Sequence, residues 1–243
     1  KLLSERGVTV EELPITNARV DCKQLKKILR PETKLVAMDA VCGETGVIWN
    51  TREVAEALRQ HGRRNTLLAP SGPIGMSQPV ASKSVFAPVL HVDASQAPRT
   101  EKMTRAHFGA DLLTLDGAKV GVRGLGVLIA HRTIPLAPLY RGGGQERGLR
   151  PGSESPELAR DFAACLRQAV YERATFRTAA ERERTRLIEA ILRNVSNVFV
   201  NEGRVQAPNI LNLSLPGRDT DYLVALLDEA GFAVSTNIGF PPV

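Results

Sequence analysis

The sequence has few cysteines and few aromatic residues, and it has no long apolar run. Its 243 residues include three cysteines, Cys22, Cys42 and Cys165, without paired spacing. That number and spacing argue against a disulfide framework and favour a reducing compartment, so we predict a cytoplasmic protein. No apolar run approaches the ~18 residues that a membrane-spanning helix needs, and we expect no membrane partner.

Positive charge is in modest excess, with Lys+Arg 32 against Asp+Glu 26 and a net charge of +6. The basic residues are spread over 23–30, 59–64 and 173–193, and in the last segment they alternate with glutamates. Mixed charge at helical spacing is typical of a solvated helix face, and aromatics make up 5% of the chain, too few for a stacking platform. We therefore expect no nucleic-acid partner. The four histidines have no second ligand at metal-binding spacing, so we expect no metal site.

The first half of the sequence alternates predicted strands and helices, which indicates an α/β fold. Strands are expected at 34–40, 89–92, 110–115 and 126–130. Asp21 should open a helix over 21–30, and Thr51 should cap a second helix that runs to His61 and ends at Gly62. Residues 63–88 contain four prolines and no helical period, and they are expected to form an irregular insert.

The second half begins with a glycine-rich loop over 141–155, followed by a long helix from Pro156 to about residue 194. The remainder predicts strands at 196–200 and 209–215, a helix at 220–230 and a strand at 232–235. We therefore divide the chain into a large α/β domain over 1–140 and a smaller α+β unit over 141–243.

A carboxylate and an amide follow the predicted strand at 89–92, in the segment His91-Val92-Asp93-Ala94-Ser95-Gln96. Ligands of open α/β sheets bind at the carboxyl ends of the strands. Asp93 has two interpretations: a loop or helix-cap carboxylate, or a carboxylate that holds a protonated ring nitrogen.

Lys119 follows the next predicted strand, in the glycine-rich segment Asp116-Gly117-Ala118-Lys119. A lysine in such a turn is usually solvated. Beside a strand-end carboxylate, however, its amine could instead form a Schiff base with a pyridoxal aldehyde.

Several blocks of the sequence, in order, resemble the pyridoxal-phosphate cysteine desulfurases of the class V aminotransferase group. The blocks are VCGETGVIWNTREVAEALRQHG, HVDASQAP, GADLLTLDGAK, VGVRGLGVLI, RGGGQERGLRPGS and APNILNLSLPG. The resemblance covers all but the insert at 63–88. It implies a partial fold-type I pyridoxal-phosphate transferase, with a cofactor-binding large domain and a smaller C-terminal domain.

The resemblance also implies roles for four residues. Lys119 matches the lysine that forms the Schiff base, and Asp93 matches the partner of the pyridinium nitrogen. Gln96 matches the side chain that contacts the phenolic oxygen of the cofactor. Ser153 matches a residue that reaches the phosphate across a homodimer interface.

The sequence departs from the family pattern in ways that bear on activity. Gly43 stands where the family has an asparagine, and Asp116 stands where it has a phosphate-binding serine. The acceptor cysteine of the family would fall near Phe240, where this sequence has none. The chain is also expected to be truncated at both ends relative to the family.

We therefore expect a pyridoxal-phosphate-dependent cysteine desulfurase-like protein that converts L-cysteine to L-alanine and passes sulfur on as a persulfide. The resemblance implies a role in iron–sulfur cluster assembly and a possible sulfur-acceptor protein as partner. The missing acceptor cysteine predicts impaired activity. The alternatives are another class V enzyme, or a non-catalytic remnant that binds a partner.

Overall fold

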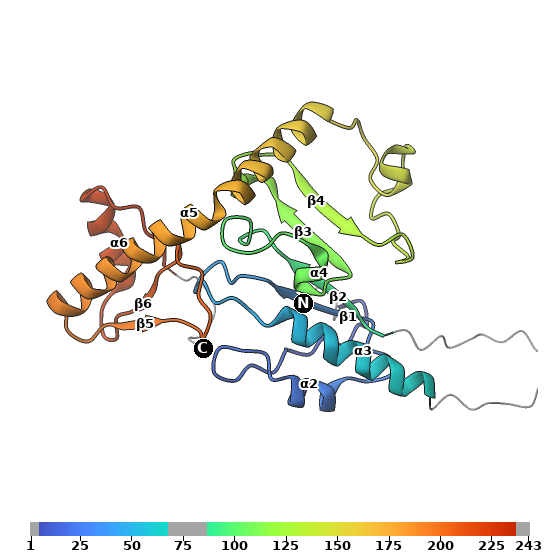
Figure 1. Cartoon of the computed structure of the whole chain (residues 1–243), viewed down its shortest axis with the longest axis horizontal. Helices are drawn as coiled ribbons and strands as arrows, with labels where there is room; N and C mark the ends of the chain where they lie inside the picture. The colour runs from blue at the N-terminus through green and yellow to red at the C-terminus, as the bar shows by residue number, and fades with distance from the viewer. Residues whose placement is uncertain (1–4, 68–86, 237–243) are drawn as a thin grey trace, which may run out of the picture.

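The computed structural model describes residues 5–67 and 87–236 and is organised around one four-stranded sheet (Figure 1). Its strands are β1 (Leu35–Asp39), β2 (Val89–Asp93), β3 (Leu112–Asp116) and β4 (Gly126–Ala130), in the order β1-β2-β3-β4. Strands β1, β2 and β3 are parallel, and β4 is antiparallel to β3. The four predicted strands of the first half are confirmed to within two residues at each end.

Because side chains alternate along a strand, every second apolar residue of β2 and β3 points into the buried core. Leu90, Val92 and Leu113 are at most 2% exposed and belong to one buried cluster. Helices α2 (Cys22–Ile28) and α3 (Thr51–Leu67) contribute Leu25 and Leu58 to this cluster. The side chain of Asp21 accepts hydrogen bonds from the first-turn amides of α2, which confirms the predicted cap.

Helix α3 differs from the prediction at both ends. It begins at Thr51, and the carbonyl of Asn50 accepts the first helical hydrogen bond, from Val54. It also continues past Gly62 to Leu67. A single glycine costs a helix only about 1 kcal/mol. Packing explains the glycine at position 62, because a Cβ there would lie 2.6 Å from the Cβ of Ala87. Residues 68–86 of the predicted insert lie outside the described residues.

Two short helical turns on the way to β4 were not predicted. Helix α4 (Arg105–Phe108) is capped by the side chain of Thr104, and the 3₁₀ turn η1 (Gly117–Val120) follows β3 directly. Four-residue elements give too few positions for a hydrophobic period to be recognised in the sequence.

The second half contains the 3₁₀ turn η2 (Gln145–Gly148), the 39-residue helix α5 (Pro156–Asn194) and a two-stranded antiparallel sheet. Its strands are β5 (Phe199–Asn201) and β6 (Asn212–Ser214), and helix α6 (Thr220–Glu229) follows. Figure 1 shows α5 running from the main sheet to these elements. The division at residue 140 stays a prediction.

The strand predicted at 232–235 is wrong, since the chain is irregular there. The backbone amide of Phe232 donates to the carbonyl of Leu227, and that of Gly231 donates to Asp228. These bonds close the C-terminal end of α6, so the amide of Phe232 is not available to a strand partner.

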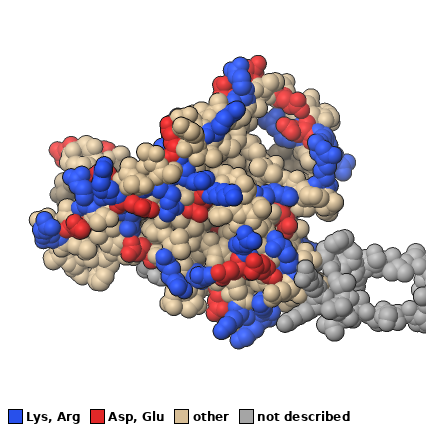
Figure 2. Space-filling model, in the orientation of Figure 1, with Lys and Arg blue, Asp and Glu red and all other residues tan. Residues whose placement is uncertain are grey.

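The basic excess is distributed as the sequence predicted. Figure 2 shows lysine and arginine side chains interspersed with aspartates and glutamates on the face in view. On α5, Arg177 pairs with Glu181 and Arg186 pairs with Glu183. Among the described residues, no helix has both the length and the apolar character of a membrane span.

Candidate active site

The carboxyl ends of β1, β2 and β3 bring several acidic side chains to one edge of the sheet. Asp93 is in register with Asp39 on β1 and with Thr114 on β3. Asp116 ends β3, and Lys119 follows in η1. Because adjacent strands lie about 4.8 Å apart, the structure brings the predicted lysine and carboxylate to neighbouring strand ends.

The turn that carries Lys119 is fixed by its own backbone. Asp116 caps η1, its Oδ1 accepting from the amide of Ala118 at 2.9 Å. Gly117 is required next, because a Cβ there would lie 2.5 Å from the carbonyl oxygen of Val122. Val120 is buried and η1 packs against α5, whereas Lys119 is exposed. The amine is therefore presented to solvent from an anchored turn.

Gln96 lies against the loop that follows β1. A Cβ built on Gly43 would lie 3.1 Å from Nε2 of Gln96. The space that a larger residue would need at position 43 is thus partly filled by the Gln96 amide. The glycine at position 43, where the family has an asparagine, therefore leaves room for the Gln96 side chain in its present position.

The same loop is held by the C-terminal half of the chain. Nε2 of Gln206 donates to the carbonyl of Thr45 at 2.6 Å, and the amide of Ala207 donates to that of Gly46 at 2.8 Å. Asn212 donates to the carbonyl of Glu44. The edge of the site is therefore built from segments far apart in the sequence.

Asp39 is a site residue that the sequence reasoning missed. Burial raises the pKa of its carboxyl group, and the charges of Asp93 and Glu44 raise the pKa further. Asp39 ends a parallel strand, as Asp93 does, so the rule that selected Asp93 could have selected it too. In the sequence, Asp39 stands inside the mostly apolar run 34–40 and not after it, so it does not stand out as a strand-end carboxylate.

Ser153 lies apart from these residues. It is exposed, between η2 and α5. Among the described residues, no hydrogen bond or ion pair joins Ser153 to Asp93, Gln96 or Lys119. Its predicted phosphate contact across a dimer interface stays a prediction.

The three cysteines are free and half-buried. Burial and the charge of Glu53 raise the pKa of Cys22, which makes it a poor nucleophile. Cys165 packs against the core from α5, as its spacing predicted, and Cys42 precedes Gly43. The position near Phe240 lies outside the described residues.

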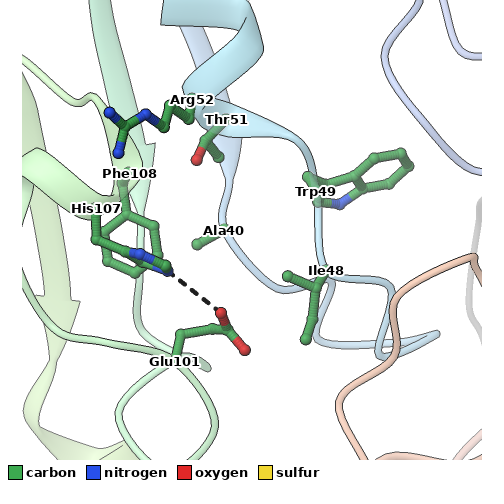
Figure 3. Close-up of a pocket in the computed structure, with 8 residues that line it drawn as sticks. All are labelled: Ala40, Ile48, Trp49, Thr51, Arg52, Glu101, His107 and Phe108. Atoms are coloured by element: carbon green, nitrogen blue, oxygen red, sulfur yellow. Dashed lines mark hydrogen bonds and ion pairs between the residues drawn. The ribbon is translucent and has the colours of Figure 1, made fainter.

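A separate pocket of about 320 Å³ lies where α3 begins (Figure 3). Its lining includes Thr51 and Phe108 together with Glu101 and His107, whose Oε2 and Nε2 atoms are 3.4 Å apart, within hydrogen-bonding distance. Glu101 also pairs with Arg177 of α5 at 3.0 Å. None of the four predicted site residues lines this pocket, and Glu101 joins α5 to the loop that follows β2.

The fold and this edge define an α/β protein with a lysine and a carboxylate on neighbouring strand ends. The sequence model of the aminotransferase class-V family matches residues 1–67 and 74–239. The chain therefore belongs to the class-V aminotransferase family, whose enzymes depend on pyridoxal phosphate. The resemblance that the sequence predicted is confirmed.

Relatives in the family bear the names of desulfurases. The chain is 26% identical over 238 residues to cysteine desulfurase IscS 1 of Archaeoglobus fulgidus, covering 97% of this chain and 56% of the relative. It is 30% identical over 227 residues to putative cysteine desulfurase IscS 1 of Bacillus subtilis, covering 90% of this chain and 52% of the relative. The chain thus spans little more than half the length of these relatives.

Solved structures give the same fold. A NifS-like protein superposes with a TM-score of 0.80 at 25% identity, covering 97% of this chain and 59% of that one. DndA from Streptomyces lividans superposes with a TM-score of 0.72 at 29% identity, covering 95% and 60%. The predicted fold class, a partial fold-type I transferase, is confirmed.

The residues at the sheet edge fit the ring and the aldehyde of pyridoxal phosphate. A primary amine can take the aldehyde and a carboxylate can hold a protonated ring nitrogen. The phosphate group needs hydrogen-bond donors, and Asp116, at the start of the lysine turn, offers only acceptors through its carboxylate.

Proposed function

We propose that this chain is part of a pyridoxal-phosphate-dependent cysteine desulfurase-like enzyme. The observation that supports it best is the placement of Asp93 at the end of β2 and of Lys119 in the turn that follows β3, the adjacent parallel strand. The reaction converts L-cysteine and an acceptor thiol into L-alanine and a persulfide, so one sulfur atom moves and no redox partner is needed.

The bound cofactor would act as an electron sink for the substrate's α-carbon. Asp93, with Oδ1 engaged by a backbone amide, keeps a second oxygen for a ring N–H. Lys119 stands exposed on an anchored turn, free to bind the aldehyde and then to give and take the proton at the α-carbon. Gln96 presents an amide next to Gly43, where it would orient the ring.

L-cysteine is proposed as substrate because the matched relatives are named desulfurases, and a structure of the same fold is described as SspA in complex with cysteine. The acceptor thiol would come from a loop cysteine or from a sulfur-acceptor protein. Free cysteines favour a reducing, cytoplasmic compartment. A homodimer and a place in iron–sulfur cluster assembly belong to the same proposal.

The test is spectroscopic. Addition of pyridoxal phosphate should produce a visible absorbance band that Lys119→Ala abolishes and that the surface variant Lys102→Ala retains. Added L-cysteine should then release sulfide in the presence of a thiol. If the unsubstituted protein shows no such band, cofactor binding is refuted and the non-catalytic, partner-binding alternative is favoured. A band without sulfide release would favour another class V activity.

A further inference from the structure

We propose that Ser95 is a positioning residue that ties the turn carrying Lys119 to the carboxylate of Asp93. No role was assigned to it from the sequence. The inference rests on the proposed function, because it concerns how the same site is held together.

Ser95 makes one hydrogen bond to each side of the site. Its backbone amide donates to Oδ1 of Asp93 at 2.8 Å. Its hydroxyl accepts from the backbone amide of Asp116 at 3.0 Å. The residue therefore connects the end of β2, which carries the carboxylate, with the end of β3, from which the lysine turn begins.

The backbone hydrogen bonds between β2 and β3 do not by themselves fix the position of Asp116 relative to Asp93. The last backbone bond from the β2 chain to β3 is donated by Ala94 to the carbonyl of Thr114 at 2.9 Å. Beyond it the chain after β2 turns away, while β3 continues two residues to Asp116, paired with β4. The Ser95 hydroxyl bridges the two chains at the point where the ladder stops.

One more hydrogen bond connects Asp116 to the turn that carries Lys119. Asp116, held by Ser95, accepts from the amide of Ala118, the residue before Lys119. At the other end, the bond to Oδ1 sets the orientation of the Asp93 carboxylate. Among the described residues, Oδ2 of Asp93 has no hydrogen-bond partner and remains for a ring nitrogen.

The segment that carries Ser95 is itself immobilised. Ala94 and Ala97 are 0% exposed and belong to the buried core cluster. Ser95 thus reaches Asp116 from a rigid support, as a positioning group requires.

Alanine at position 95 isolates the hydroxyl. The bond from the Ser95 amide to Asp93 is made by backbone and persists in Ser95→Ala, so the carboxylate keeps that donor. Only the bond to Asp116 is lost. Ser95→Thr restores a hydroxyl, and Ser155→Ala is a matched control, because the Ser155 side chain makes no capping hydrogen bond.

The experiment compares these three variants with the parent chain by two readouts. Hydrogen exchange of the Asp116 amide, measured by NMR without cofactor, should be about three- to tenfold faster in Ser95→Ala, the equivalent of one lost hydrogen bond. With pyridoxal phosphate, Ser95→Ala should bind about three- to tenfold more weakly, and the pH midpoint of its absorbance band should move. Ser95→Thr should restore both, and Ser155→Ala should match the parent.

Each other outcome overturns the proposal. Unchanged exchange at Asp116 would show that the bridge is absent in solution. Faster exchange with an unchanged pH midpoint and affinity would leave Ser95 a structural role only. A parent protein without the lysine-dependent band would refute the proposed function, and this inference with it.

Discussion

Replacing Gly46 by alanine should destabilise the protein through both its backbone and its surroundings. Gly46 has φ +78°, in the left-handed region that residues with a Cβ rarely adopt. A Cβ there would also overlap Nε2 of Gln206 and lie 2.9 Å from the Cβ of Ile210. Gln206 cannot swing away without losing its bond to the carbonyl of Thr45.

The magnitude follows from two contributions. Holding alanine in a left-handed conformation costs about 1–2 kcal/mol. Overpacking against Gln206 and Ile210 adds about 1–3 kcal/mol. The expected loss is therefore about 2–5 kcal/mol, a large part of the ~5–15 kcal/mol that stabilises a typical domain.

Urea denaturation of Gly46→Ala and Gly217→Ala separates these contributions. Gly217 has nearly the same φ, +76°, but a Cβ there would meet nothing within 4 Å. The control should lose only the backbone part, about 1–2 kcal/mol. If the two variants lost the same free energy of unfolding, the tight packing of Gln206 around Gly46 would be refuted.

Three further predictions concern charged and titratable groups. Arg177→Met should cost about 1–3 kcal/mol, because the Glu101 side chain is 15% exposed and, among the described residues, would keep only His107 as a side-chain partner. Thermal denaturation against the exposed control Arg182→Met measures this. Asp39→Asn should stabilise the protein at neutral pH. The pKa of Asp39 is raised in the folded state, so its carboxyl opposes folding above that pKa, and the opposition fades as pH falls toward the unfolded value; a variant with the parent's stability at every pH would contradict this. Cys22 should react with iodoacetamide at pH 8 more slowly than a cysteine in an unfolded peptide, since its raised pKa leaves less thiolate. Peptide mass spectrometry measures the rate, and a rate equal to that of the peptide would contradict the burial of Cys22.

The sequence predicted the strands and the inward faces of the long helices because each rests on a repeated local pattern. In α3, Val54 and Leu58 are at most 2% exposed, as their spacing required. Gly62 misled the prediction because local propensity cannot show that Ala87 would come within contact distance. The strand predicted over 232–235 failed for a similar reason, since the amide of Phe232 closes a helix end.

The candidate site was predictable one strand end at a time. The rule for carboxyl ends selected Asp93, and resemblance selected Lys119 and Gln96. What the sequence could not give is how these ends are joined. The bond from Asp116 to Ser95 spans 21 residues and depends on the order of β2 and β3, so no local spacing encodes it.

The bond between Thr45 and Gln206 joins residues 161 apart, which has a consequence for how the protein forms. During synthesis the loop after β1 leaves the ribosome long before its partner segment does. Closing so large a loop carries an entropic cost that is met late in folding. Substitutions at this contact should therefore accelerate unfolding more than they slow folding. The loop after β1, which lies beside Gln96, would then be among the last parts of the protein to fold.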